Sequence, residues 1–138
     1  MRGYVFLVIL LLTACGSQSE SELRRTPWER GDYTFPGEPE AVSNSIFLAA
    51  KRCFDGKRIN LLRTFVHKEP HPDGDGFIIT AFQLGTFDAA ILIQMEIKPA
   101  PQGSRVALFR SASMLVNERV GPFVERWVKG ETACPSVL

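Results

Sequence analysis

The residues best suited to acid–base or metal chemistry gather in one short segment, between His67 and Asp75. It holds both histidines of the chain, His67 and His71, together with Glu69, Asp73 and Asp75. Imidazole and carboxylate groups bind metals, which makes this segment a weak candidate metal site. However, prolines and glycines interrupt it, and its Asp-Gly-Asp-Gly run lacks the further acidic positions of a calcium loop. The pattern favours a solvated hairpin loop with no bound metal.

Motifs of common catalytic sites are missing from the sequence. It contains no Gly-x-Ser-x-Gly elbow, no phosphate-binding glycine loop and no His-Glu-x-x-His helix. Cys53 and Cys134 would need a neighbouring base to act as nucleophiles, and no histidine is close to either in sequence. We therefore predict a protein that is not an enzyme and needs no cofactor.

The chain begins with the features of a secretory signal peptide. Arg2 gives a positive charge, and an almost unbroken apolar run follows from Tyr4 to Leu12. This run is too short to span a bilayer, which takes about 20 apolar residues. A basic start, a short apolar stretch and small residues at its end are typical of a segment that is removed on export.

The end of this segment, Leu12-Thr13-Ala14-Cys15, resembles the lipobox of bacterial lipoproteins. The resemblance implies that residues 1–14 are removed and that Cys15 carries a diacylglyceryl group on its thiol and an acylated amine. The partner of the mature N-terminus would then be the lipid bilayer. Gly16 and Ser17 follow, and neither is the Asp that marks inner-membrane retention in many such lipoproteins, so an outer-membrane location is favoured. The alternative is an ordinary cleaved signal in which Cys15 is incidental.

Export places the two remaining cysteines, Cys53 and Cys134, in a compartment where disulfides form. We expect them to be bridged, which would close a loop of about 80 residues and stabilise the fold by on the order of 4 kcal/mol. Two free buried thiols are the alternative. A metal pair is disfavoured because neither cysteine has another Cys or His at ligand spacing.

Charge excludes one class of partner. Loss of Arg2 with the signal leaves basic residues equal in number to the 15 acidic ones. A balanced chain without a basic run carries no electrostatic footprint for nucleic acid.

Composition divides the mature chain into two parts. Residues 15–30 are polar and predict a lipidated, flexible tether, with Trp28 either docked on the domain or placed at the lipid interface. Residues 31–138 predict one small domain.

Hydrophobic periodicity predicts the elements of that domain. A short strand is expected at Asp32–Phe35, and apolar residues from Val42 to Cys53 recur at helical spacing between Pro39 and Gly56. A second helix is expected from Asn117 or Pro122. Four strand candidates lie between the helices: Ile59–Lys68, Phe77–Leu84, Ala89–Lys98 and Arg105–Ala112.

Short connections between these strands favour an antiparallel meander. We therefore predict an α+β fold with an antiparallel sheet of four to five strands and two helices packed on one face. The order (β)-α-β-β-β-β-α resembles the helix-grip arrangement of some outer-membrane assembly lipoproteins and of lipid-binding domains. This resemblance concerns element order alone.

Three arginines, Arg63, Arg105 and Arg110, fall within predicted strands. They indicate either a solvated sheet face or a polar surface that binds a partner. The leading hypothesis is a membrane-anchored module, facing the periplasm, that binds or helps to assemble envelope proteins. The alternative is a carrier of an apolar, lipid-like ligand held between the helices and the sheet.

Overall fold

The structure is a computed structural model, and it describes residues 19–59, 61–86, 89–112 and 118–136. The predicted signal peptide at 1–14 and the predicted lipidation site Cys15 therefore lie outside the described residues. Within the described ranges, no helix is both long and apolar enough to cross a bilayer. The elements in chain order are α2 (Glu20–Arg25), β1 (Glu29–Phe35), α3 (Pro39–Phe54), β2 (Arg58–Ile59), β3 (Leu62–Pro70), β4 (Phe77–Leu84), β5 (Ala89–Ala100), β6 (Gly103–Arg110) and α4 (Gly121–Val128).

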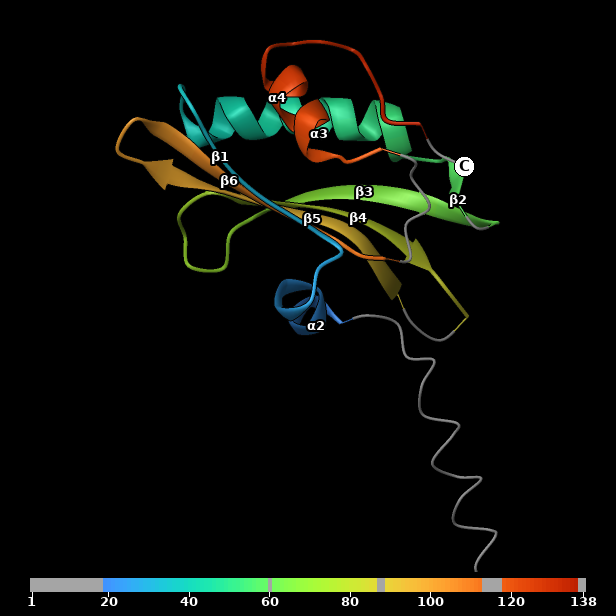
Figure 1. Cartoon of the computed structure of the whole chain (residues 1–138). Coiled ribbons are helices and arrows are strands. Elements are labelled where there is room, and N and C mark those ends of the chain that lie inside the picture. Colours follow the sequence, from blue (N-terminus) through green and yellow to red (C-terminus); the bar gives the residue numbers. More distant parts are fainter. Residues whose placement is uncertain (1–18, 60, 87–88, 113–117, 137–138) are drawn as a thin grey trace, which may run out of the picture.

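The strands form one antiparallel sheet in the order β1-β6-β5-β4-β3-β2. Figure 1 shows α3 and α4 on one face of this curved sheet and α2 on the opposite face. The α+β class is thus confirmed, but the described residues form six strands and three helices instead of the expected four to five strands and two helices. The extra strand arises because the predicted strand from Ile59 is broken by a tight turn, so that Ile59 pairs with Leu62 in a hairpin.

Alternation along the strands separates the two faces of the sheet. Ile93, Met95 and Ile97 of β5 belong to the main core beneath α3 and α4, whereas Glu96 and Lys98 point to the other face. The largest side chains of the main core lie fully buried between helices and sheet, among them Ile46, Phe54, Ile79, Leu92, Leu108 and Trp127. We refer to the opposite surface, which carries α2, as the open face.

A disulfide joins Cys53 near the end of α3 to Cys134 after α4, as the sequence predicted. Its two cysteines are 81 residues apart, so the bridge removes much of the freedom of the unfolded chain. The indole N–H of Trp127 donates to the carbonyl of Ala133, which fastens the same segment to α4. Both helices are therefore tied together at one end of the helical layer.

The predicted flexible tether is wrong for residues 20–30, which belong to the fold. Ser19 caps α2 through its side-chain oxygen, and Leu23 is fully buried against the open face. Arg24 donates to Gln94 and Glu96 of β5. The sequence prediction missed this helix because the segment has few apolar residues. One leucine and one arginine are enough to dock α2, because both lie opposite complementary groups of the sheet. Residues 15–18 of the predicted tether lie outside the described residues.

Arg110 was predicted to lie on a solvated or partner-binding face, and this prediction is wrong. Its side chain points to the helix face and is buried beside Glu29, with 3.5 Å between Nη1 and Oε2. Nη1 also donates to the carbonyl of Glu118, and the guanidinium lies 3.9 Å from the ring centroid of Trp28. Burial lowers the pKa of Arg110, and the charge of Glu29 opposes that shift. Trp28, whose placement the sequence left open, is thus docked on the domain.

Glu29 supplies the compensating charge and also begins α4. Its two carboxylate oxygens accept from the backbone N–H groups of Val120 and Gly121, each at 2.9 Å. These N–H groups have no partner within the helix, and the positive end of the helix favours a carboxylate there. One buried side chain of β1 therefore positions both β6 and α4.

Replacement of Glu29 by alanine is expected to destabilise the fold strongly. Arg110 would remain buried without its countercharge, and two backbone N–H groups would lose their acceptor. We expect a loss of about 3–5 kcal/mol of unfolding free energy, measured by urea denaturation. Asp32→Ala is the matched control, since it breaks an ion pair of the same strand with Arg105 that is exposed to solvent. A Glu29→Ala loss as small as that of the control would contradict this role.

Candidate functional site

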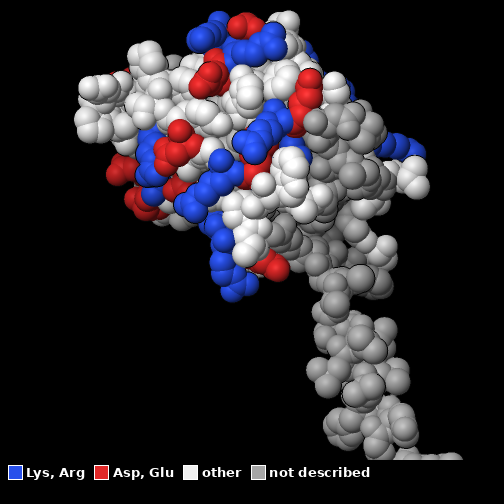
Figure 2. Space-filling view, in the orientation of Figure 1, with Lys and Arg blue, Asp and Glu red and all other residues white. Residues whose placement is uncertain are grey.

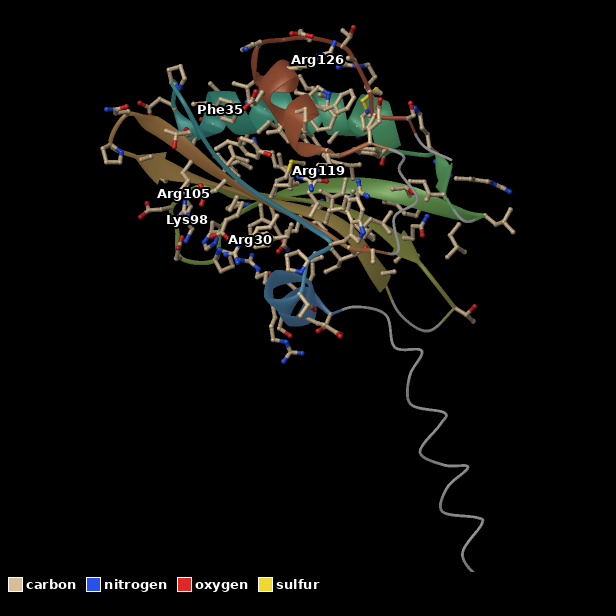
Figure 3. The ribbon with its side chains drawn as sticks, in the orientation of Figure 1. Arg30, Phe35, Lys98, Arg105, Arg119 and Arg126 are labelled. Carbon is tan, nitrogen blue, oxygen red and sulfur yellow. A yellow bond between two sulfur atoms is a disulfide. The ribbon has the colours of Figure 1, made fainter. Side chains whose placement is uncertain are left out.

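A shallow groove on the open face is the best candidate for a functional site. It has a volume of about 190 Å³ and is lined by strands β1, β6 and β5. Figure 3 shows Arg30, Lys98 and Arg105 extending from neighbouring strands on the side of the sheet away from α3 and α4. The complete lining is Arg30, Gly31, Asp32, Glu96, Lys98, Arg105, Ala107 and Phe109.

One wall of the groove is an exposed ion pair. The guanidinium of Arg105 donates to both carboxylate oxygens of Asp32, with 2.9 Å between Nε and Oδ1. This hydrogen bonding lowers the pKa of Asp32 and raises the pKa of Arg105. The two residues lie on paired strands, where cross-strand neighbours share a face. The pair gives the groove a polar rim that is exposed to solvent.

The opposite wall is built around Glu96, which three cationic or potentially cationic groups approach. Arg24 Nη1 lies 2.7 Å from Oε2, and His71 Nε2 and Lys98 Nζ lie 2.8 and 3.1 Å from Oε1. Burial raises the pKa of Glu96, but hydrogen bonds from Arg24 and Lys98 outweigh burial, so the pKa is lowered overall. Glu96 therefore links the docked helix α2, the β3–β4 loop and the groove.

The predicted cluster of His67, Glu69, His71, Asp73 and Asp75 is only partly brought together. His67 and Glu69 lie exposed on β3, with 4.0 Å between Nε2 and Oε2. His71 and Asp73 join the Glu96 network, whereas the backbone of Asp75 donates to Asp73. Among the described residues no three His, Cys, Asp or Glu side chains are arranged to hold a metal ion.

The His71 ring lies between two carboxylates. Its Nδ1 is 2.6 Å from Asp73 Oδ1 and 3.2 Å from the backbone N of Asp73. A protonated ring donates to Asp73 and Glu96 at once, whereas a neutral ring accepts the Asp73 N–H at Nδ1 and donates to Glu96. Asp73 also accepts from Lys98 at 2.6 Å, and these bonds, the Lys98 bond first, hold the pKa of Asp73 at about 2. Both ring nitrogens are thus committed to structure.

Arg30 differs from the other cations of the groove. Its guanidinium lies 5.5 Å from the ring centroid of Phe109, and Arg24 lies 5.4 Å from the same ring. No ion pair of Arg30 is found among the described residues. Arg30 is therefore available to a carboxylate or another anionic group that enters the groove.

The three arginines of the predicted strands occupy different positions in the structure. Arg105 lines the groove, Arg63 is exposed at the start of β3, and Arg110 is buried on the other face. Sequence reasoning missed Arg24 and Arg30 as site residues because both lay in the predicted tether. It missed Asp32 because its partner Arg105 lies on a strand that is distant in the chain. The alternation of β5, which sets Glu96 and Lys98 opposite the apolar residues of the same strand, is the sequence signal that could have found this face.

Comparisons with known proteins gave no match: no protein-family model, no curated protein and no solved structure is similar to this chain. The groove must therefore be interpreted from its own chemistry.

Docking of α2 should depend on pH through Glu96. Folding lowers the pKa of Glu96 below its ordinary value of 4.5. The ionised carboxylate therefore contributes fully to the docking of α2 above pH 4.5, and this contribution is lost as the pH falls through the lower pKa of the folded state. We expect hydrogen exchange of the α2 amides, corrected for intrinsic rates, to rise in the wild type below that pH. In the Glu96→Gln variant, hydrogen exchange of the α2 amides should already be fast at neutral pH. Glu20→Gln, which breaks only the exposed pair with Arg24, is the control, and equal exchange in all three proteins would contradict the role of Glu96.

Proposed function

We propose that this chain is a non-catalytic lipoprotein, anchored by Cys15 to a membrane that is by preference the outer membrane, and that its periplasm-facing domain binds an envelope protein. The observation that carries the proposal is the charged groove of the open face. In it the Arg30 guanidinium lies against the Phe109 ring and forms no ion pair among the described residues, although its charge contributes to the lowered pKa of Asp32.

The position of α2 bears on how close the domain lies to its anchor. The described part of the chain begins at Ser19, four residues after Cys15, and Ser19 already caps α2. Even a fully extended chain of that length spans only about 14 Å. The proposed tether is therefore much shorter than the 15–30 segment that composition suggested. Because α2 lies on the open face (Figure 1), a short tether would hold that face near the bilayer.

The dimensions of the groove favour a protein surface over a small molecule. Its volume of about 190 Å³ is below the roughly 300–1,000 Å³ of typical ligand pockets. Its three cations and two carboxylates form a mixed pattern, also visible as adjoining blue and red areas in Figure 2. Such a pattern gives orientation and specificity to a complementary protein face. An acidic side chain of the partner would pair with Arg30.

The apolar-ligand alternative has weaker support. It requires space between the helices and the sheet, and in the described part of the chain that layer is filled by packed side chains such as Ile46, Phe54 and Met95. The open groove is polar along most of its lining. The binding-module proposal therefore explains more of the structure.

The anchor is tested by Cys15→Ser in the bacterial cell. The wild type should incorporate radiolabelled fatty acid, and the variant should not, because serine offers no thiol for the diacylglyceryl transfer that the lipobox resemblance implies. Gel autoradiography reads the result. Equal labelling of both proteins would refute the anchor.

The groove is tested by a photo-reactive residue placed at Thr34, which is exposed on β1, with the same residue at Leu48 of α3 as control. We expect discrete adducts with an envelope protein from position 34 and not from position 48. Arg30→Glu should weaken the position 34 adduct at least about tenfold by placing like charges together. Adducts that are equal at both positions, or insensitive to Arg30→Glu, would count against the groove.

A further inference from the structure

The β2–β3 hairpin presents leucines to solvent at one end of the sheet. Leu61, Leu62 and Leu84 are 88, 43 and 55 % exposed, respectively. Leu62 pairs with Ile59 in the hairpin, and Leu84 ends the neighbouring strand β4 just after the residue that pairs with Thr64. We call these three residues the leucine tip. Single exposed leucines are common on proteins, but these three gather at one end of the sheet, although strand alternation directs Leu62 and Leu84 toward opposite faces.

Leu61 occupies this position at a conformational cost. Its φ of 67° makes it the one non-glycine residue of the described chain with a positive φ. Left-handed backbone suits glycine and asparagine, and a bulky side chain there is disfavoured. Because Leu61 is almost fully exposed, no packing within the domain compensates for that cost.

The strands of the same hairpin carry a second unfavourable feature. Arg58 and Arg63 are directly opposite each other, and like charges in such a pair are destabilising. Lys57 precedes them and is exposed as well. None of these three cations has an ion pair within the described residues. The hairpin is therefore both apolar at its apex and positively charged along its strands.

We propose that the leucine tip docks onto a bilayer that contains anionic lipids. The leucine side chains enter the boundary between headgroups and acyl chains, while Lys57, Arg58 and Arg63 pair with lipid phosphates. Both features that are unfavourable in water become favourable there: apolar area is buried and unpaired cations meet anions. This inference rests on the proposed membrane anchor for the nearness of a bilayer, and it is independent of the groove.

A protruding apex is better suited to insert into a lipid surface than to bind a groove on a partner protein. The turn places Leu61 at the extremity of a two-stranded hairpin, where a side chain can pass between headgroups without displacing other elements. Arginines one to three residues away can keep their guanidinium groups at phosphate level while their stems lie along apolar surface. Arg63 already lies 5.5 Å from the ring centroid of Phe65, which holds it beside the tip.

The test immobilises the full chain and counts captured dye-filled vesicles of phosphatidylcholine alone or mixed equally with phosphatidylglycerol. A lipid anchor inserts into either bilayer, so its contribution cancels in the ratio of anionic to neutral capture. The wild type should prefer anionic vesicles. Arg58→Glu should lower this preference at least about fivefold, and Leu61→Gly should lower anionic capture by a similar factor.

Both variants should also fold better than the wild type. Leu61→Gly relieves the left-handed backbone, and Arg58→Glu places opposite charges across the hairpin. We expect each to raise the thermal midpoint by about a few degrees, so that weaker capture cannot be due to unfolding. Leu48→Ala removes a leucine that is 63 % exposed on α3, and it should leave the preference unchanged.

Three results would overturn the proposal. The first is a wild type that captures neutral and anionic vesicles equally, which would direct attention to a protein partner for the tip. The second is a preference that survives both Leu61→Gly and Arg58→Glu. The third is a loss of the preference for anionic vesicles in Leu48→Ala that is as large as the loss in the two tip variants. Equal labelling of the wild type and Cys15→Ser, or absence of groove adducts at position 34, would count against the proposed function and leave this ratio as it is.

Discussion

Glu29 is the side chain on which the arrangement of the domain most depends. A carboxylate withdrawn from water is costly unless charge and hydrogen bonds replace its hydration. Arg110 supplies the charge, and the N–H groups of Val120 and Gly121 supply the hydrogen bonds. Because these groups come from β6 and from the start of α4, the requirement can be met only when strand and helix are in their native positions.

The rest of the helical layer follows from that placement. Once α4 begins above β1, its buried residues Val124 and Trp127 face α3, and Trp127 meets Phe54 edge to face at 6.1 Å. The chain after α4 then runs back along α3 to the disulfide at Cys53. The buried carboxylate and the disulfide thus add to the apolar core that α3 and α4 share.

The open face is organised by polar contacts with a small apolar patch. Leu23, Ile78 and Phe109 are buried but do not belong to the main core, so α2 covers a second, minor apolar cluster. Around it, Glu96 joins α2 to the β3–β4 loop and to the groove. The open face has a polar groove that is open to solvent, whereas the helical face is filled and covalently closed. This difference is a physical reason for the proposal that a partner binds the open face.

The sequence by itself determined the α+β class, the helix at 39–54, most strand positions and the cysteine pairing, because hydrophobic period, turn residues and cysteine number are local properties. Only the tertiary structure decided the direction of Arg110, the docking of α2 and the gathering of Arg30, Asp32, Glu96, Lys98 and Arg105 in one groove. Each of these depends on a partner far away in the chain, such as Glu29 for Arg110 or Gln94 for Arg24. Local patterns report which face a side chain prefers, but whether a charge can be buried depends on the residue that faces it.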